Sequence, residues 1–299
     1  MKLTLQDKEY ELLIGYQKEN EYRHAFNDLA KTVFGISFED WYKAGYWNEK
    51  YIPYTLFDEH KAVVNASANI MDFNTFGERR RYIQVGTVMT DESYRNKGLS
   101  RFLVEKILSD WNHRCDFIYL YANSTVLNFY PKLGFSPVKE FEYLKKIKKS
   151  TPSQFEILNM DLQENRDKLY HYIKNNKIFG NLSMKENADL VMFYCITILK
   201  DCVYLLKSLD VIAIAKIHSD QIHLLDVFGK VEIDLEDIID SFCDTNTDSV
   251  LLGFTPKDVT SYEVREVDEV LKDEVLFIQN GKKALFNDNK IMFPLLSHA

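Results

Sequence analysis

The feature that most constrains the fold of this chain is the stretch from residue 82 to residue 108. Residues 82–90, YIQVGTVMT, are typical of a β-strand, and the apolar residues of 99–108 recur at helical spacing. A short polar loop around Gly98 separates the two elements. A strand that turns directly into a helix directs several unpaired backbone N–H groups, and the positive end of the helix dipole, toward one place. The stretch therefore predicts an αβ unit with an anion-binding loop, which suits phosphate.

The residues of this loop favour a phosphate site. Gly98 has no Cβ, so the backbone can approach a ligand closely, and Arg95 and Lys97 bring positive charge to phosphate oxygens. The alternative is a helix that needs a capped, solvated start, and the local chemistry leaves both interpretations open. The spacing fits neither the Walker loop nor the dinucleotide fingerprint G-x-G-x-x-G.

Hydrophobic periodicity predicts the elements around the loop. The first half is expected to contain helices at 20–34 and 38–47, a hairpin of strands 61–73 and 82–90, the helix from 99, a strand at 116–123, a short helix at 125–135 and further strands. The second half is expected to contain helices at 163–176 and 186–199, a hairpin at 210–228, a helix at 234–242, a strand at 249–254 and the short strands YEVREV, EVLFIQ, KALFN and KIMFPL.

The order hairpin, helix, strand occurs twice, at 61–123 and at 210–254. It fits a degenerate internal repeat of one αβ unit, and it equally fits independent reuse of a common arrangement. A chain of 299 residues is longer than one ordinary domain needs, and the charged run KKIKKSTPSQ at 145–154 is the boundary candidate. We therefore predict two domains, 1–149 and 150–299, of the α/β class with mixed (α+β) sheets.

Charge is unevenly distributed along the chain. Residues 1–150 carry 22 Lys and Arg against 20 Asp and Glu, whereas residues 151–299 carry 15 against 25. The whole chain therefore has a formal net charge of −8. This balance argues against nucleic acid as a partner, because phosphate binding needs surplus Lys and Arg. The acidic half could attract a cationic partner, or it could only keep the protein soluble.

Membrane and metal signals are missing from the sequence. The N-terminus is charged throughout, and no apolar run approaches the ~20 residues of a membrane span. The four cysteines form no CxxC pair, and the histidines have no metal-like spacing, so we expect surface or hydrogen-bonded histidines at His171, His218, His223 and His298. We predict a cytoplasmic protein with reduced thiols, no metal and no membrane partner.

Two separate motifs resemble those of the GNAT superfamily of acyl-CoA N-acyltransferases. Residues 95–100, RNKGLS, resemble the family's loop R-x-x-G-x-G/A, with Ser100 in place of the usual Gly or Ala. Residues 123–135 resemble the family's second motif, and they keep its Asn, Tyr, Lys and Gly-Phe as Asn123, Tyr130, Lys132, Gly134 and Phe135. The resemblance covers roughly residues 20–145.

The resemblance implies a fold and a set of binding residues. The implied fold is a mixed, twisted sheet, splayed open between the strand before the loop and the strand after the helix, where the pantetheine of acetyl-CoA inserts. The backbone of Val88, Met89 and Thr90 is implied to contact the thioester and pantetheine. The pyrophosphate is implied to lie on the backbone amides of the loop residues Arg95, Asn96, Lys97, Gly98, Leu99 and Ser100.

The second motif implies two more site residues. Asn123 matches the family's cofactor-side position, and Tyr130 matches the tyrosine that donates a proton to the departing sulfur in many relatives. An unperturbed phenol has a pKa of about 10 and is protonated at neutral pH. Each residue also has a purely structural reading, Asn123 as a helix N-cap and Tyr130 as an aromatic packed on the helix.

The general base is left open. Where histone acetyltransferase relatives carry a Glu, this chain has Gln84, which cannot accept a proton. Glu21, Glu39 and Asp40, or a water that relays to them, are candidates on the acceptor side. Relatives with tandem domains of this kind sometimes place the terminal carboxylate in the active site, which adds Ala299.

The second half carries no such loop. Its corresponding stretch has Asp234, Glu236 and Asp237 where phosphate would have to bind, and like charge repels it. We predict that this half binds no coenzyme and either covers the acceptor cleft or forms a homodimer surface.

Two groups of residues, an arginine run and a set of aromatic side chains, each allow a functional and a structural interpretation. The run 79–81, RRR, is expected in a hairpin turn, either solvated or in contact with the 3′-phosphate of coenzyme A. A set of aromatic residues could wall an acceptor pocket for a cationic amine or could form core: Trp41, Tyr42, Tyr46, Trp47 and Tyr51.

The motifs together predict an N-acetyltransferase. It would move the acetyl group of acetyl-CoA directly, through a tetrahedral intermediate, to a primary amine of a small molecule or peptide. One alternative is a non-catalytic acyl-CoA-binding or sensing protein. The other is an aminoglycoside-type drug acetyltransferase, whose polycationic substrate the acidic second half would suit.

Overall fold

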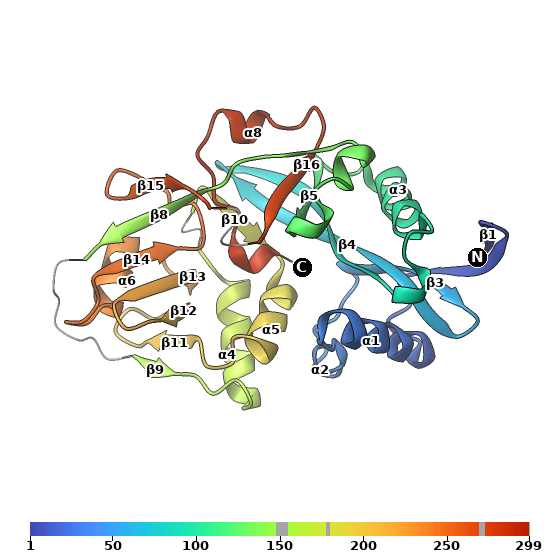
Figure 1. The fold of residues 1–299 in the computed structure, drawn as a ribbon. Coiled ribbons are helices and arrows are strands. Elements are labelled where there is room, and N and C mark those ends of the chain that lie inside the picture. The colour runs from blue at the N-terminus through green and yellow to red at the C-terminus, as the bar shows by residue number, and fades with distance from the viewer. Residues whose placement is uncertain (148–154, 178–179, 269–272, 299) are drawn as a thin grey trace.

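Two mixed β-sheets with helices packed around them make up the molecule (Figure 1). The computed structural model describes residues 1–147, 155–177, 180–268 and 273–298. The first sheet runs, in order of pairing, through β1 (Lys2–Leu5), β2 (Lys8–Ile14), β3 (Tyr51–Asp58), β4 (Lys61–Thr75), β5 (Glu78–Thr90), β6 (Phe117–Ala122), β16 (Val275–Gln279) and β7 (Phe135–Pro137), with β10 (Leu182–Lys185) on β4. The second runs through β15 (Glu263–Glu266), β8 (Phe141–Lys146), β14 (Ser249–Leu252), β13 (Gln221–Gly229), β12 (Val211–Ile217), β11 (Val203–Leu206) and β9 (Glu156–Ile157).

Both sheets combine antiparallel strands with a parallel pair, which confirms the predicted α/β class with mixed sheets. The longer helices are α1 (Asn20–Phe34), α3 (Leu99–Trp111), α4 (Gln163–Lys174), α5 (Ala188–Thr197) and α6 (Leu235–Phe242). The shorter ones are α2 (Glu39–Lys43), α8 (Ala284–Asn287), and the 3₁₀ turns η1 (Glu92–Tyr94), η2 (Ser124–Val126), η3 (Tyr130–Leu133) and η4 (Leu295–Ser297). No helix in the described ranges is long and apolar enough to cross a membrane.

The first sheet opens between β5 and β6. These parallel strands pair over residues 82–84 of β5, and their described residues pair no further toward the carboxyl end. On its other side β5 follows β4 to Thr90, with a register shift between Asn65 and Ser67. Thr87 lies at this bulge with a positive φ of 48°. A bulge bends its strand and increases the local twist, so β5 can turn away from β6 here.

Helix α3 is held on the sheet by one apolar face. Its buried residues recur at helical spacing and pack on β3, β4 and β5: Leu99, Leu103, Val104, Ile107 and Trp111. Full burial of one such side chain stabilises the fold by about 1.5–3 kcal/mol. This face therefore fixes where the N-terminus of α3 lies relative to the end of β5.

The predicted order hairpin, helix, strand is present in both halves. In the first half it consists of β4, β5, α3 and β6, and in the second of β12, β13, α6 and β14. The pairing also agrees, since β12 is antiparallel to β13 and β13 is parallel to β14. The second half thus repeats the arrangement of the first, including the helix between the two parallel strands.

Each sheet is completed by a strand from the other half. β16 lies between β6 and β7 in the first sheet, and β8 lies between β14 and β15 in the second. The two sheets therefore use residues from both sides of the predicted boundary between 149 and 150. That boundary stays a prediction about folding units, but it does not divide the sheets.

An aromatic core joins the two halves. Phe26 of α1 and Trp41 of α2 belong to the same buried cluster as Val191 and Met192 of α5. The indole Nε1 of Trp41 donates a hydrogen bond to the carbonyl of Asp189 at 2.7 Å. The contact buries apolar residues from both halves, so their relative position is fixed by packing.

Several segments form a different type of secondary structure from the one predicted. Residues 125–135 form the turns η2 and η3 rather than one helix, because Pro131 sits at the start of η3 and Gly134 ends it at φ 83°. KALFN contains the helix α8 rather than a strand, and KIMFPL forms no strand. Residues 79–81 lie within β5 rather than in a turn.

The last described residues fold back onto the first sheet. The N–H of Leu295 donates to the carbonyl of Gly253 at 2.9 Å, and the hydroxyl of Tyr119 on β6 donates to the carbonyl of Ser297 at 3.2 Å. Figure 1 shows this segment (red) between α5 and β16, in the middle of the molecule. The chain thereby brings His298 beside β6.

Candidate active site

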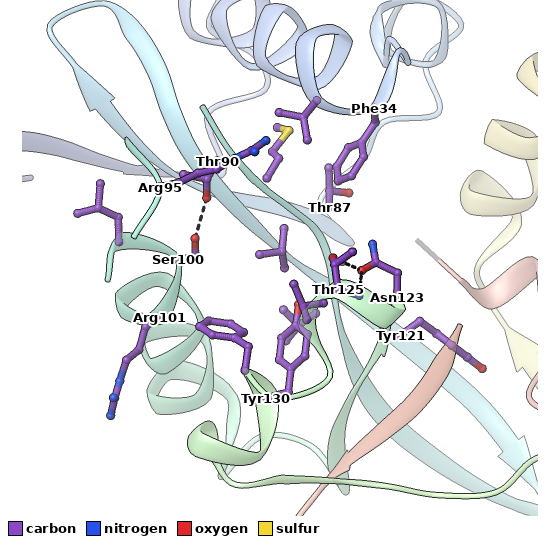
Figure 2. A pocket seen from close by; sticks show the side chains of 18 of the residues that line it. Phe34, Thr87, Thr90, Arg95, Ser100, Arg101, Tyr121, Asn123, Thr125 and Tyr130 are labelled. Atoms are coloured by element: carbon purple, nitrogen blue, oxygen red, sulfur yellow. Dashed lines mark hydrogen bonds between the residues drawn. The ribbon is translucent and has the colours of Figure 1, made fainter. Parts of the chain in front are cut away.

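A cavity of about 910 Å³ lies where β5 and β6 separate. Every residue predicted to bind the coenzyme or to protonate the thiolate lines this one cavity: Val88, Met89, Thr90, Arg95, Asn96, Lys97, Gly98, Leu99, Ser100, Asn123 and Tyr130. Figure 2 shows Arg95, Ser100 and Arg101 toward one end and Phe34, Thr87 and Tyr121 toward the other, with Tyr130 between them. We call these the loop end and the acceptor end.

The loop end presents a helix N-terminus with free donors. Asn96 and Gly98 both have positive φ, 61° and 70°, which turns the chain sharply into α3. Gly98 occupies the N-cap position, and no described side chain caps the helix there. A Cβ built on Gly98 would meet no heavy atom within 4 Å, so the space beside it is open. Of the two readings of the loop, the uncapped helix start favours an anion site.

Two further contacts shape the loop end. The hydroxyls of Ser100 and Thr90 are hydrogen-bonded at 2.7 Å, which ties the start of α3 to the end of β5 (Figure 2). Ser100, which departs from the family's Gly or Ala, thus has a partner on the strand. Lys97 Nζ donates to the carbonyl of Ser93 at 2.7 Å, while the exposed Arg95 makes no ion pair with the described residues. Arg95 is therefore available to an anionic ligand.

Thr87 is a site residue that sequence reasoning missed. Its hydroxyl accepts a hydrogen bond from Tyr51 at 2.7 Å, and its carbonyl accepts one from Asn65 Nδ2 at 2.8 Å. A β-branched residue at positive φ is rare, so the sequence does not predict this conformation, and the two hydrogen bonds stabilise it. The bulge carries the backbone of Val88 and Met89 into the cavity lining.

Tyr130 is packed among aromatic rings and also lines the cavity. It is 4% exposed and packs against Phe129, Phe135 and Phe277 at ring distances of 5.0, 6.3 and 6.0 Å. It also lines the cavity, and its hydroxyl makes no hydrogen bond with the described residues. Burial raises the pKa of Tyr130 to about 12, so the phenol keeps its proton at neutral pH.

Asn123 acts as the predicted cap. Its Oδ1 accepts from the N–H and the hydroxyl of Thr125, at 3.1 and 2.6 Å, and so begins η2. The side chain is exposed at the cavity rim. The capping role is thus seen directly, and contact with the coenzyme stays a prediction.

The acceptor end is built from distant parts of the chain. Its lining residues are Val33 and Phe34 at the end of α1, Tyr121 of β6, Tyr194 of α5, Glu274 before β16, and His298. Sequence reasoning placed none of them here and grouped His298 with surface or hydrogen-bonded histidines. In fact its Nε2 is buried without a partner among the described residues. Only long-range pairing brings these residues together, so no local pattern marks them.

The carboxylates proposed as general base lie elsewhere. Glu21, Glu39 and Asp40 are outside the cavity lining. Glu39 pairs with Arg23 at 3.0 Å, and this hydrogen bond holds the pKa of the Glu39 carboxyl below its usual range. Gln84 does line the cavity, but it is an amide. Ala299 lies outside the described residues.

The two ambiguous groups are resolved by packing. Trp41, Tyr46, Trp47 and Tyr51 are core residues, 2–7% exposed, and Tyr42 is partly buried against the same core; none of the five lines this cavity. The arginines 79–81 also lie outside the lining. They pair instead with carboxylates on neighbouring segments, namely Asp72, Glu78, Asp116 and Glu186.

The N-terminus of α6 contrasts with that of α3. Asp234 caps α6 by accepting from the N–H of Glu236 at 3.0 Å, and the Glu236 carboxylate pairs with Lys145. One N–H donor and one carboxylate at this helix start thus have intramolecular partners. The prediction that the second half binds no coenzyme is consistent with this arrangement.

A family match agrees with the loop and its helix. Residues 16–138 match the family model for the acetyltransferase (GNAT) domain. This match supports an acyltransferase. No curated protein matches this sequence.

Solved structures share the fold over most of the chain. A conserved protein of unknown function from Enterococcus faecalis V583, described as a probable N-acyltransferase, is 14% identical with a TM-score of 0.52 and covers 93% of this chain and 74% of its own. Eis1 from Mycobacterium abscessus is 13% identical with a TM-score of 0.53, over 89% of this chain and 73% of its own. A GCN5-related N-acetyltransferase from Anabaena variabilis ATCC 29413 is 12% identical with a TM-score of 0.54, over 90% and 72%. The likeness extends beyond residue 138, so the second half belongs to the shared fold.

Proposed function

We propose that this protein transfers the acetyl group of acetyl-CoA to a primary amine of a small molecule or peptide. One observation carries the proposal: a single cavity is lined by the uncapped start of α3 and by the buried, protonated phenol of Tyr130. The first suits a pyrophosphate, and the second suits a departing thiolate.

The residues of the cavity fit the coenzyme in order. Backbone N–H groups at Gly98, Leu99 and Ser100, with the charge of Arg95, would hold the pyrophosphate. The opening between β5 and β6 would admit the pantetheine along Val88. An open space beside Gly98 that a Cβ would fill supports a close approach of ligand to backbone there.

Acyl transfer then requires balanced bond changes. The neutral amine attacks the thioester carbonyl, a C–N bond forms, and a tetrahedral intermediate results. When the C–S bond breaks, the Tyr130 hydroxyl donates its proton to the sulfur, which leaves as a thiol. The surplus proton of the amine nitrogen is released and restores the phenol. Positioned proton transfer of this kind contributes typically about 10²–10⁴ in rate.

Calorimetric titration with acetyl-CoA tests the proposal. We expect saturable binding at one site per chain, lost in Gly98→Glu, whose side chain would fill the open space with negative charge. Gly77→Glu is the matched control, because Gly77 also has positive φ (90°) but lies in the β4–β5 turn outside the cavity lining. No binding by the unaltered protein, or equal binding by Gly98→Glu, would overturn the coenzyme site.

Thiol release separates an enzyme from an acyl-CoA sensor. Spermidine, kanamycin and a lysine-containing peptide serve as probe amines, and kanamycin tests the aminoglycoside alternative directly. If the protein binds acetyl-CoA but releases no thiol with any of the three amines, the result favours the sensing protein.

A further inference from the structure

Three distant segments meet around one histidine at the acceptor end of the cavity. The Nδ1 of His298 lies 3.5 Å from Oε2 of Glu274, which precedes β16. The imidazole stacks on Tyr121 of β6 with ring centres 3.7 Å apart and planes inclined by 26°. The hydroxyl of Tyr194 on α5 donates to the backbone carbonyl of His298. Glu274 and Tyr121 thus contact the ring, and Tyr194 holds the backbone of the same residue.

One nitrogen of this ring has no hydrogen-bond partner among the described residues. The His298 side chain is 14% exposed, and its Nε2 is buried without a hydrogen-bond partner among the described residues. A buried polar atom without a partner costs free energy, so it calls for a functional explanation. With Nδ1–H directed to the Glu274 carboxylate, Nε2 carries the lone pair of the neutral imidazole. His298 is also part of the cavity lining.

We propose that His298 is the general base that takes the proton from the acceptor amine, with Glu274 as its positioning residue. This assignment rests on the proposed acetyl transfer. As the amine nitrogen bonds to the acetyl carbon, its surplus proton passes to Nε2, and the Glu274 carboxylate stabilises the imidazolium. Tyr130 gives its own proton to the thiolate, and the imidazolium then returns a proton through solvent to the phenolate. The sum is one amide and one free thiol.

The other groups that face His298 do not suit this role. Burial raises the pKa of the phenols of Tyr121 and Tyr194 above their ordinary value, so both stay protonated and cannot accept a proton at neutral pH. Behind Tyr121, the Glu140 carboxylate accepts hydrogen bonds from the Tyr121 hydroxyl at 3.2 Å and from the N–H of Phe293 at 3.0 Å. Glu274 is the remaining anion, and its side chain is half exposed.

The acceptor end also suits a cationic amine. Phe34, Tyr121 and Tyr194 provide aromatic faces, and Glu274 provides negative charge. An alkylammonium group drawn in by these residues must lose a proton before it can attack. That first proton passes to solvent, and His298 takes the second one as the C–N bond forms.

His298→Asn is the primary variant, and His113→Asn, on an exposed histidine outside the cavity lining, is its matched control. With spermidine and the lysine peptide, we expect kcat to fall about 10²-fold or more in His298→Asn and to hold in His113→Asn. Acetyl-CoA affinity is expected to stay within about twofold, because the loop end is unchanged. The acidic limb of the pH–rate profile is expected to disappear.

Two more variants separate chemistry from folding. Added imidazole is expected to restore turnover in His298→Ala by entering the space that the ring vacates, which a merely structural histidine would not allow. Glu274→Gln removes the carboxylate beside Nδ1 that orients the imidazole, so kcat is expected to fall by less than in His298→Asn while the KM for acetyl-CoA holds.

Each outcome decides the assignment. Full turnover in His298→Asn overturns it, as does loss of acetyl-CoA binding together with activity and without imidazole rescue. Turnover by the unaltered protein is measured first. If it turns over none of the probe amines, the proposed function itself is contradicted. If the unaltered protein and His298→Asn are equally active, the general-base assignment is wrong and the proposed acetyl transfer still stands.

Discussion

At the scale of single residues, the cavity separates two proton-transfer groups by environment. Tyr130 lies among apolar rings that hold its phenol protonated, while the Nδ1 of His298 lies 3.5 Å from the Glu274 carboxylate. An acid and a base in one cavity can therefore act on opposite ends of the same reaction.

Tyr130→Phe tests the acid. The hydroxyl has no described partner to leave unpaired, so the melting temperature is expected to hold or rise, while kcat falls about 10²-fold. Because burial raises the phenol pKa from 10.0 to about 12, Tyr130 is expected to cause no loss of the parent's rate between about pH 8 and pH 10. The measurement is thiol release across this range. Tyr204→Phe, at a buried tyrosine of the second sheet, is the control, and equal rates in both variants would remove Tyr130 from the mechanism.

At the scale of elements, the sequence predicted what local periodicity encodes. The long helices α1, α3 and α4 agree with prediction within a few residues, because their apolar residues recur at helical spacing. Residues 125–135 carried the same spacing, but Pro131 and Gly134 broke it into 3₁₀ turns. The strands β1 and β2 were not predicted, since their charged residues obscure the alternation. The loop and Tyr130 were found because their motifs are contiguous.

The bulge of β5 belongs to this scale, and Asn65 is the side chain that holds it. Its Nδ2 donates to the Thr87 carbonyl at 2.8 Å and its Oδ1 accepts from the Thr55 hydroxyl at 2.7 Å. Asn65→Ala leaves the Thr87 carbonyl without this donor and the Thr55 hydroxyl with Tyr16 alone, so we expect a loss of about 1–3 kcal/mol in the free energy of unfolding. Acetyl-CoA affinity is expected to fall as well, because the bulge orients Val88 and Met89.

Asn69→Ala is the comparison for this prediction. Asn69 also bridges β4 to β5, donating to the Gln84 carbonyl at 3.5 Å, but it lies before the bulge. Denaturant unfolding and calorimetry of both variants check the expectation. Stability should fall in each, and affinity only in Asn65→Ala; an unchanged affinity there would mean that the bulge does not shape the coenzyme site.

At the scale of the whole molecule, pairing between distant segments decides the acceptor end. Phe34, Tyr121, Tyr194, Glu274 and His298 come together because β16 inserts beside β6 and the last residues fold under α5. Such contacts depend on sheet order, which periodicity does not specify. Because composition does not specify sheet order either, the charged run at 145–154 suggested a boundary, although each half contributes a strand to the other half's sheet.

The crossing strands predict that the halves do not fold separately. A polypeptide of residues 1–149 lacks β16, whose Leu276, Phe277 and Ile278 are at most 2% exposed, and it leaves the edge of β6 unpaired. We expect it to aggregate when produced alone, and to form a soluble, acetyl-CoA-binding complex when produced with residues 150–299. Size-exclusion chromatography and calorimetry measure both, with the full chain cut between residues 149 and 150 as the control. A soluble, monomeric 1–149 that binds acetyl-CoA as tightly as the full chain would show that the exchanged strand is dispensable, and the boundary would then be a true domain boundary.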